Sequence, residues 1–74
     1  MISDSYKLIR RERVGAIQRS WKLTYQSEQG TLVYVLLPDS VNKAPQVFNK
    51  NGIEIASPLS GQLIRRSEEY LGYY

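Results

Sequence analysis

The segment WKLTYQSEQGTLVYVLLP, residues 21–38, has the pattern of a β-hairpin and commits this chain to a sheet. Its first half alternates apolar Trp21, Leu23 and Tyr25 with polar residues, which is typical of a strand with one wet face. The letters SEQG then provide a turn that ends in glycine. The returning run TLVYVLL is apolar on both faces, which predicts a central strand covered on both sides, and Pro38 ends it because proline donates no ladder N–H.

A second hairpin is expected in QVFNKNGIEIA, residues 46–56, where Phe48, Ile53 and Ile55 flank a turn. Asn51 and Gly52 suit the two positive-φ positions of a type I′ turn. A three-residue loop over residues 50–52 is the competing interpretation, and it changes the register by one residue. The intervening segment PDSVNKAP, residues 38–45, reads as an exposed loop because it lies between two prolines and contains Asp, Ser and Asn.

The two ends of the chain are less regular. Residues 5–19 fit a strand slightly better than a helix, with a bulge expected at Gly15 because the apolar phase slips along the segment. The last segment, SPLSGQLIRRSEEYLGYY, predicts a short helix with Ser60 as N-cap and Gly72 just past its end. A final strand in QLIRR is the alternative, and Arg65 and Arg66 are expected to pair locally with Glu68 and Glu69.

The predicted fold class is mainly β, bordering on α+β: a small antiparallel sheet or SH3-like barrel of four to five strands with a short C-terminal helix. The piece RVGAI followed by hairpins is compatible with SH3-like small barrels, which share that general arrangement. The 74 residues are expected to form a single small domain, residues 1–74. Because so short a chain buries only about 60% of its unfolded surface, a partner or a second copy is a serious prospect.

Composition argues against catalysis. The sequence contains no cysteine and no histidine, so the commonest nucleophile activator and transition-metal ligands are missing. Carboxylates are scattered without ligand spacing, and no phosphate-binding motif is present. We therefore expect a non-enzymatic protein without metal or cofactor. No apolar run approaches the roughly 18 residues of a membrane span, and the start lacks the order of a secretory signal, so a soluble cytoplasmic protein is expected.

Charge is the one feature with functional content. The net charge of +3 is concentrated in residues 1–22, which carry +4, while residues 23–74 carry −1. Arginine binds phosphate and stacks on bases, and aromatic rings stack on unpaired bases. The predicted nucleic-acid contacts, to DNA or RNA, are Arg10, Arg11, Arg13, Arg19, Trp21 and Lys22. The competing interpretation places Trp21 in the core, which we favour for a sole tryptophan, and makes the arginines an ordinary solvated surface.

Two hypotheses of function follow. The first is a nucleic-acid-binding module, which requires the guanidinium groups to gather on one water-facing side without neighbouring carboxylates. The second is a protein-interaction module, a regulator, assembly subunit or homo-oligomer, that uses strand edges and the tyrosines of the tail, Tyr70, Tyr73 and Tyr74. Nucleic acid is marginally preferred, because only the basic segment exceeds what a solvated surface needs.

Overall fold

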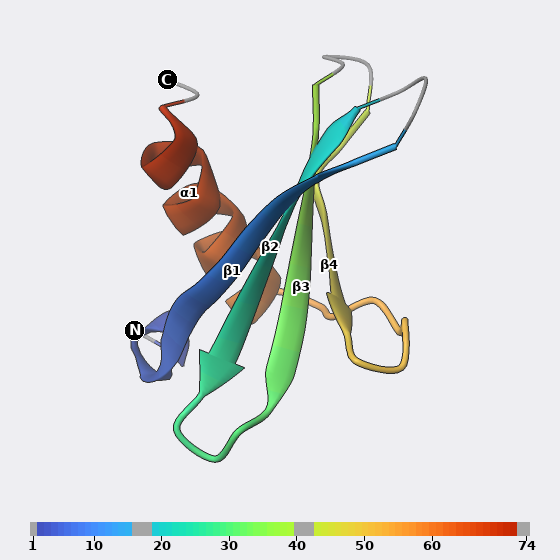
Figure 1. Cartoon of the computed structure of the whole chain (residues 1–74). Helices are drawn as coiled ribbons and strands as arrows, with labels where there is room; N and C mark the ends of the chain where they lie inside the picture. Colours follow the sequence, from blue (N-terminus) through green and yellow to red (C-terminus); the bar gives the residue numbers. More distant parts are fainter. Residues whose placement is uncertain (1, 16–18, 40–42, 73–74) are drawn as a thin grey trace.

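A computed structural model describes residues 2–15, 19–39 and 43–72, and it shows an antiparallel sheet with one helix packed against it (Figure 1). The sheet order β1-β2-β3-β4 follows the chain, so each strand pairs with the next. The elements are a 3-10 turn η1 (Ile2–Ser5), β1 (Tyr6–Val14), β2 (Ser20–Ser27), β3 (Leu32–Pro38), β4 (Gln46–Asn49) and α1 (Leu59–Leu71). The predicted mainly β fold with a C-terminal helix is confirmed, and its form is an open sheet rather than a barrel.

The core lies between the sheet and α1. Alternate residues of β2 and β3 point toward the helix, and Leu63 of α1 meets them with none of its surface exposed. The buried cluster consists of Leu23, Tyr25, Val33, Val35, Leu37, Val47 and Leu63. Trp21 is half-buried and packs against this cluster from outside, so its predicted place on the apolar side of β2 is confirmed, but it is not one of the buried core residues.

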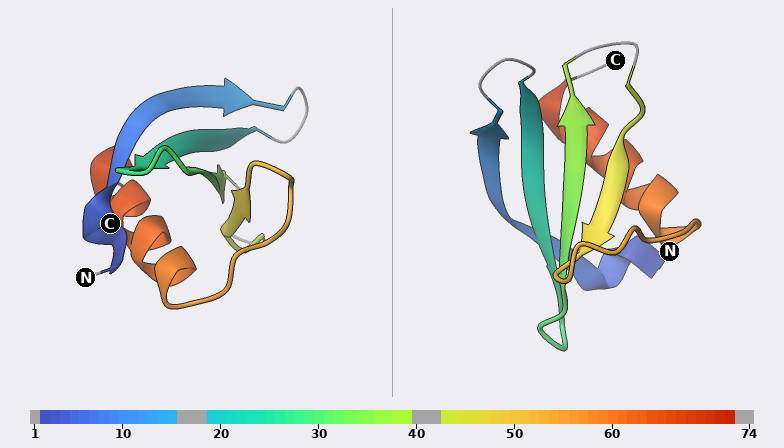
Figure 2. Two further views of the ribbon diagram at one scale, coloured as in Figure 1. Left: turned by 90° about the horizontal axis from the view of Figure 1, so that it is seen from below. Right: turned by 90° about the vertical axis from the view of Figure 1, so that its right-hand side faces the viewer.

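Strand β3 is covered on one side only, which corrects the expectation of a strand covered on both. Val33, Val35 and Leu37 are buried toward α1, whereas Leu32, Tyr34 and Leu36 point the other way and are half-buried. Figure 2 (right) shows the four strands in front of the helix, with no second layer on the near side among the described residues. The sheet therefore has one apolar-rich face without a covering element.

Both hairpins turn through three-residue loops. In the first, the Gly30 N–H donates to the Ser27 carbonyl at 2.9 Å, and Gly30 has φ 89°. In the second, the Gly52 N–H donates to the Asn49 carbonyl at 3.0 Å, with φ 80° at Gly52. Among the described residues only glycines have positive φ, so the type I′ turn expected at residues 51 and 52 is wrong and the competing loop is right.

The pairing of β4 with β3 sets which way Phe48 faces, and the loop length sets which residue after the turn lies opposite it. Phe48 lies opposite Glu54 in an isolated bridge, while the Ile55 N–H donates to the Val47 carbonyl at 2.8 Å. Because the side-chain period of a strand is two, Val47 and Phe48 point to opposite faces. Val47 is buried toward α1, and Phe48 therefore lies on the uncovered face.

Strand β1 confirms the preference for a strand in the opening segment, but its irregularity is not at the expected place. The pairing of β1 with β2 shifts between Leu8 and Arg10, where Ile9 is left without a partner and is 53% exposed. Gly15, expected to carry the bulge, instead follows the strand with φ 90°. The shift resets the alternation, so that Leu8 and Arg11 share the face toward α1 while Arg10 takes the other.

The helix begins one residue before its predicted N-cap. Pro58 occupies the cap position without a side-chain hydrogen bond, so Ser60 is inside the first turn, which corrects its assignment. The C-terminal end is as expected, because Gly72 has φ 74° and its N–H bonds back to the helix. Of the loop over residues 38–45, residues 40–42 lie outside the described residues, and Lys43 and Ala44 are exposed.

Candidate functional site

The structure divides the predicted nucleic-acid contacts between the two faces of the sheet. Residues paired directly across antiparallel strands share a face. Arg11 pairs with Leu23 and Arg13 with Trp21, so these three predicted contacts lie on the side of α1. Arg10 pairs with Thr24, and Lys22 lies two residues before Thr24, so both point away from the helix. The six residues do not form the single basic surface that the first hypothesis required, and Arg10 and Arg13 each lie beside a carboxylate. That hypothesis therefore fails in its arginine-based form, and a nucleic-acid proposal has to be based on other side chains.

Arg13 and Trp21 make a structural contact. The Arg13 guanidinium lies 4.9 Å from the centre of the Trp21 ring, and its Nη1 and Nη2 donate to the two carboxylate oxygens of Asp39 at 3.1 and 2.5 Å. A guanidinium held by a carboxylate and an aromatic ring in this way has its charge largely satisfied within the protein. Arg19, the fourth arginine predicted, is exposed just before β2 and accepts the Asp39 N–H through its carbonyl.

The guanidinium groups toward α1 also stay within the fold. Arg11 lies 5.3 Å from the ring centre of Tyr70 on the helix, and Arg66 lies 5.3 Å from that of Tyr25. Arg66 also donates to the Ser3 carbonyl, which ties η1 to α1. The local pairing expected of Arg65 and Arg66 with Glu68 and Glu69 is absent, since none of these four residues forms an ion pair in the described structure.

A buried polar link holds the helix to the sheet beneath these arginines. The Tyr25 hydroxyl lies 2.8 Å from Ser67 Oγ, which in turn donates to the Leu63 carbonyl at 2.8 Å. The Ser67 proton is used on Leu63, so Tyr25 is the donor to Ser67. Burial raises the pKa of the Tyr25 phenol, and the Ser67 hydrogen bond and nearby Arg66 charge offset part of that effect.

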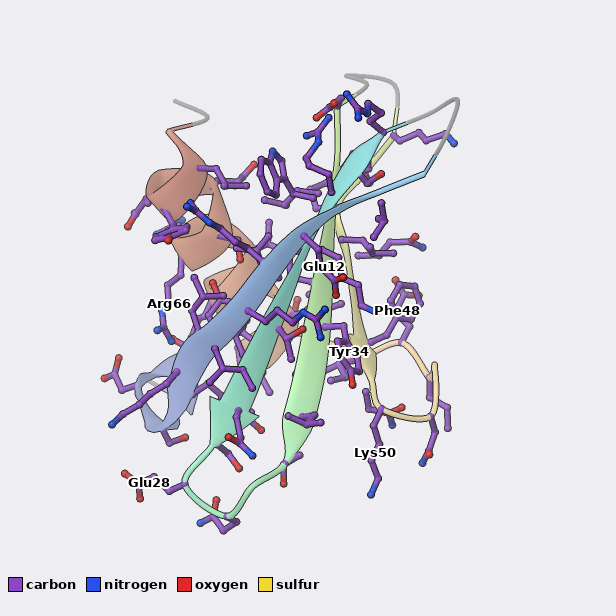
Figure 3. All side chains as sticks on the ribbon, viewed as in Figure 1. Glu12, Glu28, Tyr34, Phe48, Lys50 and Arg66 are labelled. Carbon is purple, nitrogen blue, oxygen red and sulfur yellow. The ribbon has the colours of Figure 1, made fainter. Side chains whose placement is uncertain are left out.

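We call the side of the sheet turned away from α1 the open face. Its side chains follow from the register in four rows across the strands: Lys7, Gln26 and Leu32; Arg10, Thr24, Tyr34 and Phe48; Glu12, Lys22, Leu36 and Gln46; and Val14, Ser20 and Pro38. In Figure 3 the labelled Glu12, Tyr34 and Phe48 lie together on this side, whereas Arg66 lies on the other side near α1. This face brings cations of β1 and β2 beside aromatic rings of β3 and β4.

Tyr34 and Phe48 are the centre of the open face. They are directly paired across β3 and β4, and both are half-buried. Lys22 reaches diagonally from β2 and places its ammonium nitrogen 4.6 Å from the centre of the Tyr34 ring. Two neighbouring rings with a cation above one of them form a surface that attracts flat, electron-rich or anionic groups.

Three cations and two carboxylates lie around the rings on the open face. Lys7, Arg10 and Lys22 face outward, and the Arg10 side chain is 70% exposed although its Nη2 lies 3.6 Å from Glu12. That pair is long and solvated, so it contributes little and leaves the guanidinium available to a ligand. Glu54, opposite Phe48, is the second carboxylate of this side.

The tyrosines predicted for protein interaction are only partly described. Tyr70 lies on α1 and is 53% exposed, with Arg11 against its ring. Tyr73 and Tyr74 lie outside the described residues. Within the described ranges, no helix has the length and apolar character needed to cross a membrane, and no three potential ligand residues come together around a metal position.

Comparisons with protein-family models, with curated proteins and with solved structures found no match. The geometry of the open face is therefore the basis for a functional proposal. Sequence reasoning missed Tyr34 and Phe48 because both occur in apolar runs that read as core. The sequence did contain a signal for them. One expected helix can cover only one face of a sheet, so alternate residues of an apolar central strand must point toward the uncovered face.

Proposed function

We propose that this protein is a non-catalytic binding module that holds single-stranded nucleic acid on the open face of its sheet. The observation that carries the proposal is the direct pairing of Tyr34 with Phe48 on that face, with Lys22 against the Tyr34 ring. Successive unpaired bases stack on aromatic side chains presented by a sheet, and nearby cations bind their phosphates. Arg10 and Lys22 keep their predicted role, whereas Arg11, Arg13 and Trp21 do not take part.

Energies favour a base over Lys22 as the partner of the Tyr34 ring. A solvated cation–π contact is worth about 0.5–1 kcal/mol, and a base stacked on an aromatic side chain about 1–3 kcal/mol. The flexible Lys22 side chain can then turn its ammonium toward the adjacent phosphate. In the protein without a ligand, the contact with the Tyr34 ring holds the Lys22 ammonium at the binding surface.

Cations on the open face give the strand its second attachment. Lys22 of β2 lies beside the Tyr34 ring, and Lys7 and Arg10 lie one strand further away on β1, so phosphates can follow β1 and β2 while bases lie over β3 and β4. Duplex DNA keeps its bases stacked inside the helix and offers them no access to the rings. The module should therefore prefer single strands.

The direct test is a fluorescence anisotropy titration with labelled oligonucleotides of about 12 nucleotides. We expect mixed-sequence single strands of DNA or RNA to bind more tightly than the matching duplex, and binding to weaken between about 50 and 200 mM salt. If no single strand binds at the lower salt, the proposal is overturned. A tighter complex with the duplex would also contradict it, because duplex binding needs no stacking rings.

A protein-interaction module is the second candidate, and one observation favours it. Leu32, Tyr34, Leu36 and Phe48 bring four half-buried apolar side chains to the open face, an area that a second copy or a protein partner could cover. The free edge of β1 is a poor docking place because five of its nine residues are charged, which opposes strand addition. Sedimentation of the free protein as a dimer would favour this candidate.

A further inference from the structure

The row of open-face side chains that contains Tyr34 has opposite charges at its two ends. Arg10 ends the row on β1, and on the other side of Tyr34 the row continues through Phe48 to Glu54. The Arg10 side chain is 70% exposed, with only the long contact of 3.6 Å to Glu12. Glu54 is exposed and forms no ion pair within the described part of the chain. Each end of the row therefore has a charge that a partner of opposite sign can reach.

Strand β3 lies midway between these two charges. Residues 53–55 run along the outer edge of β4, where Glu54 bridges to Phe48, so β3 has two neighbouring segments on each side. The outward side chains of β3 are apolar and half-buried: Leu32, Tyr34 and Leu36. They form an apolar ridge along the centre of the open face, and no described element covers it (Figure 2, right).

A two-fold axis along β3 makes the open face complementary to itself. A second copy turned by 180° about this line, open face against open face, keeps each row at the same level and exchanges its two ends. Arg10 of one copy then lies over Glu54 of the other, and this pair occurs twice. The apolar ridge meets the same ridge of the second copy. Sheets that pack in this way, about 10 Å apart with nearly aligned strands, are usual in β-sandwiches.

We infer that a second copy of this chain covers the open face when no nucleic acid is bound, in a two-fold dimer with Arg10 against Glu54 across the interface. Four strands about 4.8 Å apart and the seven residues of β3 give the face a flat area of about 450 Å². Twice this area is below the roughly 1,200 Å² of stable complexes, so the dimer is weak. Nucleic acid and the second copy use the same rings and exclude each other; this competition, unlike the dimer itself, rests on the proposed function.

Sedimentation equilibrium with charge-reversed variants tests the dimer. We expect the natural chain to pass from monomer to dimer between about 1 and 200 µM, the range of a weak interface. Arg10→Glu and Glu54→Arg each place two like-charge pairs across the interface and should raise the Kd of the dimer about tenfold. The double variant restores both pairs and should return this Kd close to that of the natural chain. Arg65→Glu is the matched control, because it makes the same charge change on an exposed residue of α1, outside the open face.

Three results would overturn the dimer: a natural chain that stays monomeric over this range, single reversals that dimerise as well as the natural chain, or a double variant that does not recover. The competition is tested by adding an excess of a mixed-sequence single strand of about 6 nucleotides to the dimer. We expect the dimer to dissociate into complexes with one copy of the chain, which separates it from the dimer of a module dedicated to protein contacts. A strand that binds without dissociating the dimer would contradict the shared face. If the chain dimerises and binds no strand, the dimer stands and the proposed function fails.

Discussion

Tyr34 and Phe48 lie directly opposite each other on β3 and β4, on the face of the sheet that α1 leaves uncovered. Aromatic pairs are common in protein cores, but an aromatic pair on an uncovered face is typical of an interaction site. Lys22 lies beside the Tyr34 ring, and Arg10 lies on β1 in the same row as Tyr34. The proposed stacking with single-stranded nucleic acid would use all of these side chains.

Removing either ring should weaken binding of single strands. We expect Tyr34→Ala and Phe48→Ala each to raise the Kd by about 5- to 150-fold, which corresponds to about 1–3 kcal/mol for one stacked base. Tyr70→Ala is the control, because Tyr70 is an exposed tyrosine on α1, outside the open face. Anisotropy titrations of the three variants check this, and an equal loss in Tyr70→Ala would show that the rings act only through stability.

The buried link between β2 and α1 should respond unequally to removal of its two hydroxyls. Ser67→Ala leaves the Tyr25 hydroxyl buried without an acceptor, so we expect it to lower the free energy of unfolding by about 1–3 kcal/mol. Tyr25→Phe leaves Ser67 bonded to the Leu63 carbonyl and should cost only about 1 kcal/mol. Urea denaturation of both variants tests the order, and a larger loss in Tyr25→Phe would contradict it.

The same tyrosine should make stability fall at high pH. Burial raises the pKa of Tyr25 in the folded state above its usual value of about 10, so the unfolded chain loses this proton first. The stabilisation is therefore complete below about pH 10 and is lost as the pH rises toward the folded-state pKa. Between pH 8 and about 10.5 the free energy of unfolding should fall more in the natural chain than in Tyr25→Phe; equal falls would contradict the assignment.

Two glycines should respond oppositely to alanine. Gly52 has φ 80° in the β4 loop, so Gly52→Ala introduces strain and should lower the free energy of unfolding by about 1 kcal/mol. Gly61 is inside α1, and an added Cβ would meet nothing nearer than Ser57 Oγ at 3.9 Å, so Gly61→Ala should stabilise by up to about 1 kcal/mol. Thermal melts of the two variants check the signs, and a stabilising Gly52→Ala would contradict the positive φ of that residue.

The secondary structure could be predicted from local patterns, while the residues of the open face could not. The alternation in residues 21–25 and the SEQG turn define the first hairpin, and Gly72 marks the end of α1, because these signals depend on nearby residues alone. The face of each arginine depends on the pairing shift between Leu8 and Arg10, which sends neighbouring side chains to opposite sides. A slip in apolar phase is visible in the sequence, but its position is set by pairing with β2.

The partner of Phe48 on β4, the other edge strand of the sheet, also could not be predicted from local sequence patterns. A two-residue turn would have placed it with Ile55, and the three-residue loop places it opposite Glu54. Asn49 helps to select that loop, because its side-chain oxygen accepts two backbone N–H groups of the turn. Propensity alone favours the sequence Asn-Gly for the shorter turn, so this contribution becomes visible only in the structure.

Arg10 and Arg11 are adjacent in the chain and lie on opposite faces of the sheet, which allows a direct measurement of where a nucleic acid binds. The measurement is the slope of log K against log salt for single-stranded DNA with the natural chain, Arg10→Ala and Arg11→Ala. We expect Arg10→Ala to reduce the magnitude of the slope by about 0.7, the value for one phosphate contact, and Arg11→Ala to leave it unchanged. A reduced slope in Arg11→Ala with no change in Arg10→Ala would contradict binding on the open face.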